Sequence, residues 1–258
     1  MTICKNCAKE FEGHYCPECG QKASTRRYSL RIALGEIVKK ILPVDRGWLF
    51  TAVQLLTRPG PMLRDYLAGK RVVYTHPFQF MLLVSAISLL FFSREDFESG
   101  FQAGMQQTSP GEAGELMRKQ FMDLFFTNFS AFLISVVPFL AFFSRLFYRK
   151  HEVNYAEHLV INCYLLAGSS IASMPSTLLF KILGINPFNM SSTLITTAIY
   201  LSYFVWGYLG FFRPENKILG GLKALLTYIT AYLIFIFFIG LVVALGVFVY
   251  MALWGKPQ

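Results

Sequence analysis

Long apolar runs separated by short polar segments fill the chain after residue 76. A helix needs about 20 mostly apolar residues to cross a ~30 Å hydrocarbon core. Five runs reach or approach that length, and they cover residues 77–92, 125–147, 157–179, 193–212 and 225–254. The first is short for a span, whereas the fifth is long enough to tilt. The pattern predicts an all-α membrane protein with about five transmembrane helices in residues 75–258.

An amphipathic pattern precedes these runs, in residues 23–74. Pro43 is expected to end the first helix of this region, whose apolar positions recur three and four residues apart on one face: Leu30, Leu34, Ile37, Val38, Ile41 and Leu42. A second segment, residues 48–56, is closed by an Arg-Pro-Gly-Pro sequence. Neither segment is long enough to cross a bilayer, so both are predicted to lie in the membrane interface. Packing onto the transmembrane bundle is the alternative, and the two are compatible.

The composition indicates that lipid surrounds much of the chain. Hydrophobic residues make up 54% of the 258 residues and charged residues 15%, against about 25% charged in an ordinary soluble domain. A soluble fold of this size cannot bury so much apolar surface. The net charge is +9, and 13 of the 24 Lys and Arg residues lie in residues 1–74. A basic region beside a membrane anchor favours anionic lipid headgroups as partners and disfavours nucleic acid.

The same charges predict the orientation. If all five runs cross the membrane, 19 of the 24 Lys and Arg residues fall on the side of the N-terminus. The positive-inside rule then places the N-terminus in the cytosol and the C-terminus outside. The chain opens without the apolar core of a secretory signal peptide, which agrees with this orientation. The first external segment, residues 93–124, carries six acidic residues and is expected to be mostly loop, with a short helix at 112–123.

Four of the five cysteines fall within the first 19 residues. Cys4 and Cys7 form one Cys-x-x-Cys pair, and Cys16 and Cys19 form a second. Two such pairs suit a closed tetrahedral site for a structural Zn²⁺ ion, and cytosolic thiols remain reduced and free to bind metal. The sequence therefore predicts a zinc ribbon in residues 1–22. It is expected to dock a cytosolic protein, with a folded cap that binds no partner as the alternative.

Two polar clusters near the spans are candidate functional positions. Arg64 and Arg71 precede the first span, where they could hold lipid or substrate phosphates; a topology signal with snorkelling side chains is the alternative. Glu157, His158 and Asn162 begin the third span. Polar residues within a span are functional candidates because burying them in lipid is costly. A structural cap with interhelical hydrogen bonds is the alternative for this cluster.

Several motifs in order resemble a bacterial membrane family known only as a domain of unknown function. They are the Cys-x-x-Cys ribbon, DRGWLFT at 45–51, LTRPG at 56–60, RDYLAGKR at 64–71, the His-Pro-Phe entry to the first span, and YAEHLV at 155–160. The resemblance implies a small polytopic protein of a bacterial cytoplasmic (inner) membrane with a zinc ribbon. It implies no catalytic residues.

Three functions are consistent with the sequence. The first is a non-enzymatic membrane scaffold or regulatory component whose ribbon docks a cytosolic partner. The second is a transporter or lipid-handling protein that uses the polar cluster at the start of the third span, with Arg64 and Arg71 as anion contacts. The third, a membrane-bound enzyme acting on lipid, has the least support, because the sequence shows no nucleophile–base pairing and no open metal site.

Overall fold

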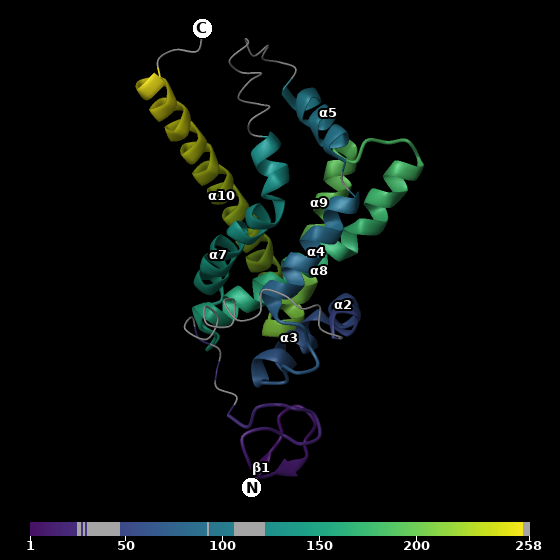
Figure 1. Ribbon diagram of the computed structural model, residues 1–258, viewed down its shortest axis with the longest axis vertical. Coiled ribbons are helices and arrows are strands. Elements are labelled where there is room, and N and C mark those ends of the chain that lie inside the picture. The colour runs from purple at the N-terminus through teal and green to yellow at the C-terminus, as the bar shows by residue number, and fades with distance from the viewer. Residues whose placement is uncertain (25–26, 28, 30–46, 92, 106–121, 255–258) are drawn as a thin grey trace.

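The structure is a computed structural model that describes residues 1–24, 27, 29, 47–91, 93–105 and 122–254. The amphipathic segment predicted at 30–42 lies outside the described residues. A small Cys-rich module forms one end of the longest axis, and helices form the remainder (Figure 1). The C-terminal end of the last helix lies at the opposite end from this module (Figure 1).

The Cys-rich module is built on one short hairpin. Strand β1 (Thr2–Ile3) pairs antiparallel with β2 (Glu10–Phe11). An isolated bridge between Tyr15 and Lys22 repeats the arrangement on the other side of the module. Phe11 is buried against Cys4 and Cys16. This core is too small to hold a fold without a further cross-link, so a metal ion is expected to supply the missing stability.

Two short helices, α2 (Trp48–Thr57) and α3 (Pro59–Ala68), connect this module to the longer helices. Arg58, with φ of −151° and ψ of 63°, separates them, and Pro59 begins α3 at a position that needs no N–H donor. Both helices contact α8, and α3 also contacts α9. The contact face is fully buried and comprises Leu55, Met62, Leu63 and Tyr66. The sequence predicted the first helix but not α3, and the structure places both against the bundle.

The remaining chain forms long helices: α4 (Pro77–Phe91), α5 (Arg94–Met105), α7 (Phe129–Phe147), α8 (Tyr155–Ile182), α9 (Met190–Phe212) and α10 (Lys217–Trp254). Four are long and apolar enough to cross a membrane, namely α7, α8, α9 and the 217–242 part of α10. Helix α4 and residues 94–100 are bent by 77° and add a fifth span only if they are counted together. The prediction of a multi-pass helical membrane protein is therefore supported, with four candidate spans.

Helix α8 lies at the centre of the bundle. It contacts α2, α3, α4, α7 and α9, and 61% of its most apolar stretch is buried, against 17% for α10. Helix α10 instead exposes many large apolar side chains, among them Leu233, Phe237 and Leu241. Such a surface is stable where acyl chains cover it.

The acidic segment after α4 is more ordered than the sequence suggested. Residues 94–105 form α5, where mostly loop was expected; the short helix predicted at 112–123 lies almost wholly outside the described residues. Lys181 at the end of α8 forms an ion pair with Asp96, with 3.2 Å between Nζ and Oδ2. The Asn186 amide donates to Asp96 O at 3.1 Å and to Ser99 Oγ at 2.7 Å. These contacts hold α5 beside the connection between α8 and α9.

Candidate functional site

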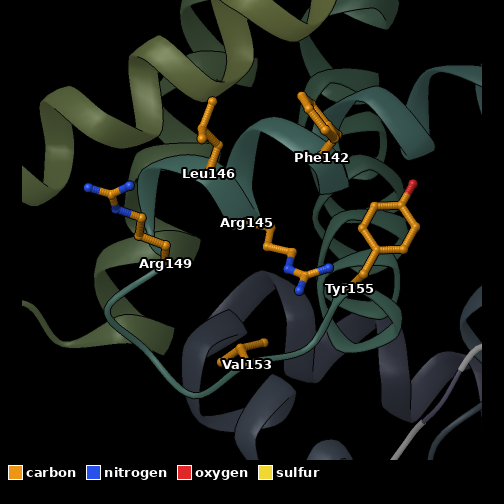
Figure 2. Close-up of a pocket in the computed structure, with 6 residues that line it drawn as sticks. All are labelled: Phe142, Arg145, Leu146, Arg149, Val153 and Tyr155. Carbon is orange, nitrogen blue, oxygen red and sulfur yellow. The ribbon is translucent and has the colours of Figure 1, made fainter.

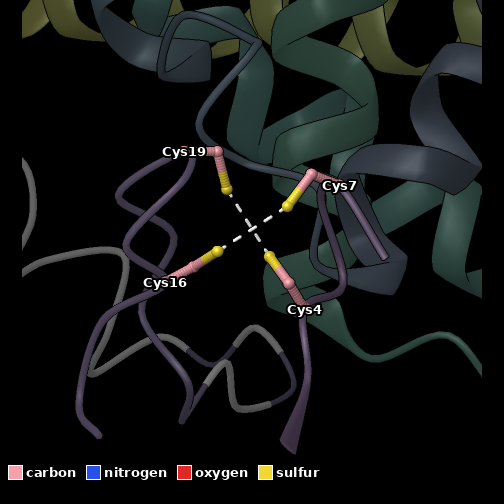
Figure 3. A group of neighbouring side chains, drawn as sticks. All are labelled: Cys4, Cys7, Cys16 and Cys19. Carbon is pink, nitrogen blue, oxygen red and sulfur yellow. Dashed lines mark hydrogen bonds between the residues drawn. The ribbon is translucent and has the colours of Figure 1, made fainter. Parts of the chain in front are cut away.

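The four N-terminal cysteines converge on one point. Their Sγ atoms all lie within 4.8 Å of one another, and they point toward a common centre (Figure 3). Cys4 Sγ lies 3.5 Å from Cys19 Sγ, and Cys7 Sγ lies 3.6 Å from Cys16 Sγ. A tetrahedral site with metal–sulfur bonds of ~2.3 Å requires Sγ separations of roughly 3.8 Å. All four are free thiols, so the geometry fits a metal ion.

Two similar turns bring the thiols together. The Ala8 N–H donates to Cys4 O at 2.8 Å, and the Gly20 N–H donates to Cys16 O at 2.9 Å. Both turns end in the left-handed region, with φ of 62° at Ala8 and 73° at Gly20. Glycine adopts that conformation without strain, whereas alanine does not. The first turn is therefore the strained one of the two.

The electrostatics of the cluster also favour a bound cation. A hydrogen bond from the backbone of Cys7, aided by one from Asn6, lowers the pKa of Cys4 to about 6. One thiolate therefore forms readily at neutral pH, whereas, despite a backbone hydrogen bond from Lys9, desolvation and side-chain hydrogen bonds with the neighbouring thiols raise the pKa of Cys7 to about 12, because thiolates this close repel one another. A bound metal ion removes that repulsion and accepts all four as ligands. His14 is exposed and does not belong to the cluster.

The Glu157 carboxylate, which is only 5% exposed, links the N-terminal region to α8. Arg27 Nε donates to its Oε1 at 2.8 Å, and Arg27 Nη2 donates to its Oε2 at 3.0 Å. The same carboxylate accepts from the Asn154 backbone N–H at 2.8 Å, while the Asn154 side chain accepts from Glu157 N, which completes a capping box. Glu157 thus has an ion-pair partner and a helix-capping contact.

His158 and Asn162 lie in a buried hydrogen-bonded network between helices. Ser144 Oγ of α7 lies 2.8 Å from His158 Nδ1 and accepts from the Asn162 amide at 3.1 Å. The hydroxyl of Tyr208 on α9 donates to Asn162 Oδ1 at 2.7 Å. His158 Nε2 is buried and has no hydrogen-bond partner among the described residues. This network therefore joins α7, α8 and α9 and leaves one ring nitrogen unsatisfied.

Arg64 contacts the end of a helix instead of that network. Its guanidinium donates to the carbonyl of Gly210, and to that of Phe211 at 3.2 Å. These carbonyls belong to the last turn of α9, where backbone acceptors lack helical partners. Desolvation by burial is the main cause that lowers the pKa of Arg64. The contact fixes α3 against α9.

Arg71 lies where the ribbon meets the membrane domain. Its backbone N–H donates to Oε1 of the buried Gln21 at 3.4 Å, and its guanidinium carbon lies 5.8 Å from the centre of the Tyr66 ring. The neighbouring Lys70 forms an ion pair with Asp65, with 3.3 Å between Nζ and Oδ1. The structure therefore brings Glu157, His158 and Asn162 together at the start of α8 and gives Arg64 and Arg71 separate contacts.

Sequence reasoning missed the partners of these residues. Arg27 is 130 positions from Glu157, and Ser144 and Tyr208 lie in different apolar runs from Asn162. A signal exists for the last of these, because a tyrosine within an apolar run usually finds a hydrogen-bond acceptor when buried. No local signal identifies Arg27 as the partner of a residue so distant.

A groove at the junction of α7 and α8 was also not anticipated. It has a volume of about 410 Å³ and is lined by Phe142, Arg145, Leu146, Arg149, Val153 and Tyr155. Arg145 points toward Tyr155, and Arg149 extends in the other direction (Figure 2). The sequence signal for this groove is a pair of arginines four residues apart at the end of an apolar run.

Comparison with known proteins identifies one related segment. A family described as "Protein of unknown function (DUF3667)" matches residues 45–89. This range covers α2, α3 and most of α4, whereas the ribbon and residues 155–160 lie outside it. No curated protein and no solved structure matches the chain. The comparison therefore supports the resemblance over this segment and assigns no activity.

Proposed function

We propose that this protein is a non-enzymatic membrane scaffold or regulatory component whose ribbon binds a cytosolic protein. The observation that supports this most directly is the position of the ribbon. It projects beyond the helices at one end of the molecule (Figure 1), and Ile3 and Tyr15 on it are each 61% exposed. Arg27 and Gln21 hold it to the membrane domain through Glu157 and the backbone of Arg71. A metal-folded module presented in this way suits docking.

Zn²⁺ is the proposed metal, since closed four-cysteine sites in the cytosol most often hold structural zinc. The proposed orientation has the ribbon in the cytosol of a bacterial cell, five crossings of the inner membrane by α4 and α7–α10, and the C-terminus outside. Its support is the gathering of positive charge at the ribbon end, where α7 and α9 end and α10 begins (Figure 1). Those ends carry Arg145, Arg149, Lys150, Arg213 and Lys217.

The docking proposal is tested with a pair of ribbon-surface variants. Full-length protein is purified with its partners from gently solubilised membranes, and stoichiometric partners are then reconstituted from purified components. We expect Ile3→Glu with Tyr15→Glu to abolish binding of such a partner, because neither side chain supports the metal site. Ile185→Glu makes the same change at an exposed position in the connection between α8 and α9 and is expected to leave binding intact.

Equal partner binding by the ribbon variant and the wild-type chain would contradict docking through this face. A metal content of one ion per chain in the ribbon variant, as in the wild-type chain, shows that its ribbon remains folded. Loss of binding in Ile185→Glu as well would assign the partner to the membrane domain instead.

A second candidate is a transporter or lipid-handling protein that uses Glu157, His158 and Asn162. The observation that favours it is the buried Nε2 of His158, which lacks a partner among the described residues. Within a span, such an atom is a candidate contact for a transported solute. Transport or lipid binding lost in His158→Ala at normal expression would support this function over the scaffold. The internal partners of Glu157 and Asn162 favour a structural role for those two residues.

A further inference from the structure

The groove at the end of α7 carries two arginines that the protein does not neutralise. Arg145 lies in the last turn of α7, and Arg149 lies four residues later, just beyond the helix. Both are exposed, and neither has an ion pair or a side-chain hydrogen bond among the described residues. The carbonyls at the end of α7 attract positive charge weakly. Two guanidinium groups are therefore available to an anion at this position.

The same groove has an apolar side. Phe142 and Leu146 lie on α7 with 58% and 48% of their surface exposed. Val153 and Tyr155 complete the wall from the α8 side, and the Tyr155 hydroxyl donates to Pro138 O at 3.2 Å. A ligand that fits this groove must combine negative charge at one end with an apolar body.

The groove also lies at the right depth for a lipid headgroup. It is at the ribbon end of α7, where the apolar stretch of that helix gives way to the polar residues 148–154 (Figure 1). Long arginine side chains at such a boundary extend toward the headgroups. Their planar guanidinium groups match phosphate oxygens by paired hydrogen bonds.

We infer that this groove binds the phosphate headgroup of an anionic phospholipid between Arg145 and Arg149, with an acyl chain along Phe142 and Leu146. In the structure Arg145 points into the space beside Tyr155 and Arg149 points away (Figure 2). Arg149 therefore changes rotamer when the lipid binds, which costs little for an exposed side chain. The inference holds whether or not the ribbon binds a partner.

Lipid binding by the full-length chain tests this inference. The protein in dodecylmaltoside is titrated with phosphatidylglycerol or phosphatidylcholine, and bound lipids are counted by native mass spectrometry. We expect one phosphatidylglycerol to bind about tenfold more tightly than phosphatidylcholine, because charge-assisted hydrogen bonds favour the net negative headgroup. Arg145→Gln with Arg149→Gln is expected to remove this preference.

A matched control removes the same charge elsewhere at the same end of the molecule. Lys150 and Lys217 are exposed and do not line the groove. We expect Lys150→Gln with Lys217→Gln to change the phosphatidylglycerol affinity by no more than about twofold, since neither ammonium group lines the groove and an exposed charge without direct contact contributes little. Leu146→Glu places a carboxylate between the arginines and is expected to abolish the preference while both remain present.

Three results would overturn the inference. The first is equal loss of affinity in the two double variants, which indicates diffuse attraction instead of a site. The second is equal affinity of the wild-type protein for the two lipids. The third is displacement of phosphatidylglycerol by equimolar glycerol 3-phosphate, which supplies the phosphate without acyl chains and so reveals a simple anion site.

Discussion

The crossing of α3 and α9 at Gly60 and Gly210 offers a sharp test of the packing. A Cβ atom added to Gly60 falls 2.5 Å from both the Cα and the O of Gly210 and nearer still to its carbonyl carbon. These are backbone atoms, so no side chain can rotate away. Normal carbon contacts of about 3.5 Å then require the two helices to separate by roughly 1 Å. If the helices separate, Arg64 also loses its contacts with the end of α9.

Alanine in place of Gly210 has longer distances from its Cβ atom to the nearest atoms. Its Cβ lies 3.2 Å from Gly60 Cα and 3.4 Å from Gly60 N, so a shift of a few tenths of an ångström accommodates it. Overpacking costs about 2–3 kcal/mol in the first case and under about 1 kcal/mol in the second, while the change to alanine returns up to ~1 kcal/mol of helix propensity. We expect Gly60→Ala to destabilise by about 2 kcal/mol and Gly210→Ala to be nearly neutral.

Thermal unfolding in detergent, followed by intrinsic fluorescence, measures the difference. A loss of about 2 kcal/mol corresponds to a Tm lower by roughly 4–8 °C in a chain of this size. Metal content serves as a control, because the nearest atoms to an added Cβ at this crossing belong to the two glycines and not to the cysteines, so the ribbon should retain its ion in both variants. The reasoning is refuted if the two alanine variants have the same Tm.

Three further predictions concern the ribbon, its tether and the loop after α7. Glu157→Gln retains a helix cap but loses the ion pair with Arg27, so limited proteolysis between ribbon and bundle should become several-fold faster while Tm changes little. Glu157→Ala also loses the helix cap, which is worth about 1 kcal/mol, and should therefore lower Tm as well. Ala8→Gly relieves the left-handed strain and should tighten metal binding about fivefold in a chelator competition, whereas Gly20→Ala should weaken it similarly. Burial, followed by the charge of Lys223, lowers the pKa of His151. The folded state therefore resists protonation of His151, and the free energy of unfolding should fall as the pH drops below about 6.5. His151→Gln should flatten this part of the Tm–pH curve.

Local patterns explain why much of the architecture could be predicted. An apolar run long enough to span a bilayer can be recognised without knowledge of the segments that it packs against. The start of α4 at Pro77 and the end of α9 at Phe212 match the predicted limits. The two Cys-x-x-Cys pairs identify the cysteine cluster in the same way, because each pair forms within a single turn.

Contacts between distant segments explain what could not be predicted. The sequence predicts a break between helices at Pro59, Gly60 and Pro61. In the structure Pro59 begins α3, and Gly60 permits the close approach of Gly210, 150 positions later. The burial of α3 against α8 and α9 stabilises a helix that its own sequence favours poorly. Likewise, Glu157 resembles a free acid within a span until Arg27 is placed beside it.

The arrangement of polar groups therefore shifts attention from the buried cluster to its surroundings. Within a bilayer a polar group must find a partner in the protein or in a ligand, because water cannot supply one. Glu157, Asn162 and Arg64 find theirs within the chain, which explains their presence near the spans without any substrate. Arg145 and Arg149 have no such partner among the described residues, and they are exposed at the end of α7, where solvent or a ligand can reach them. Unlike the buried Nε2 of His158, these two guanidinium groups line an open groove, which gives them a physical reason to bind an anion that the chain does not provide.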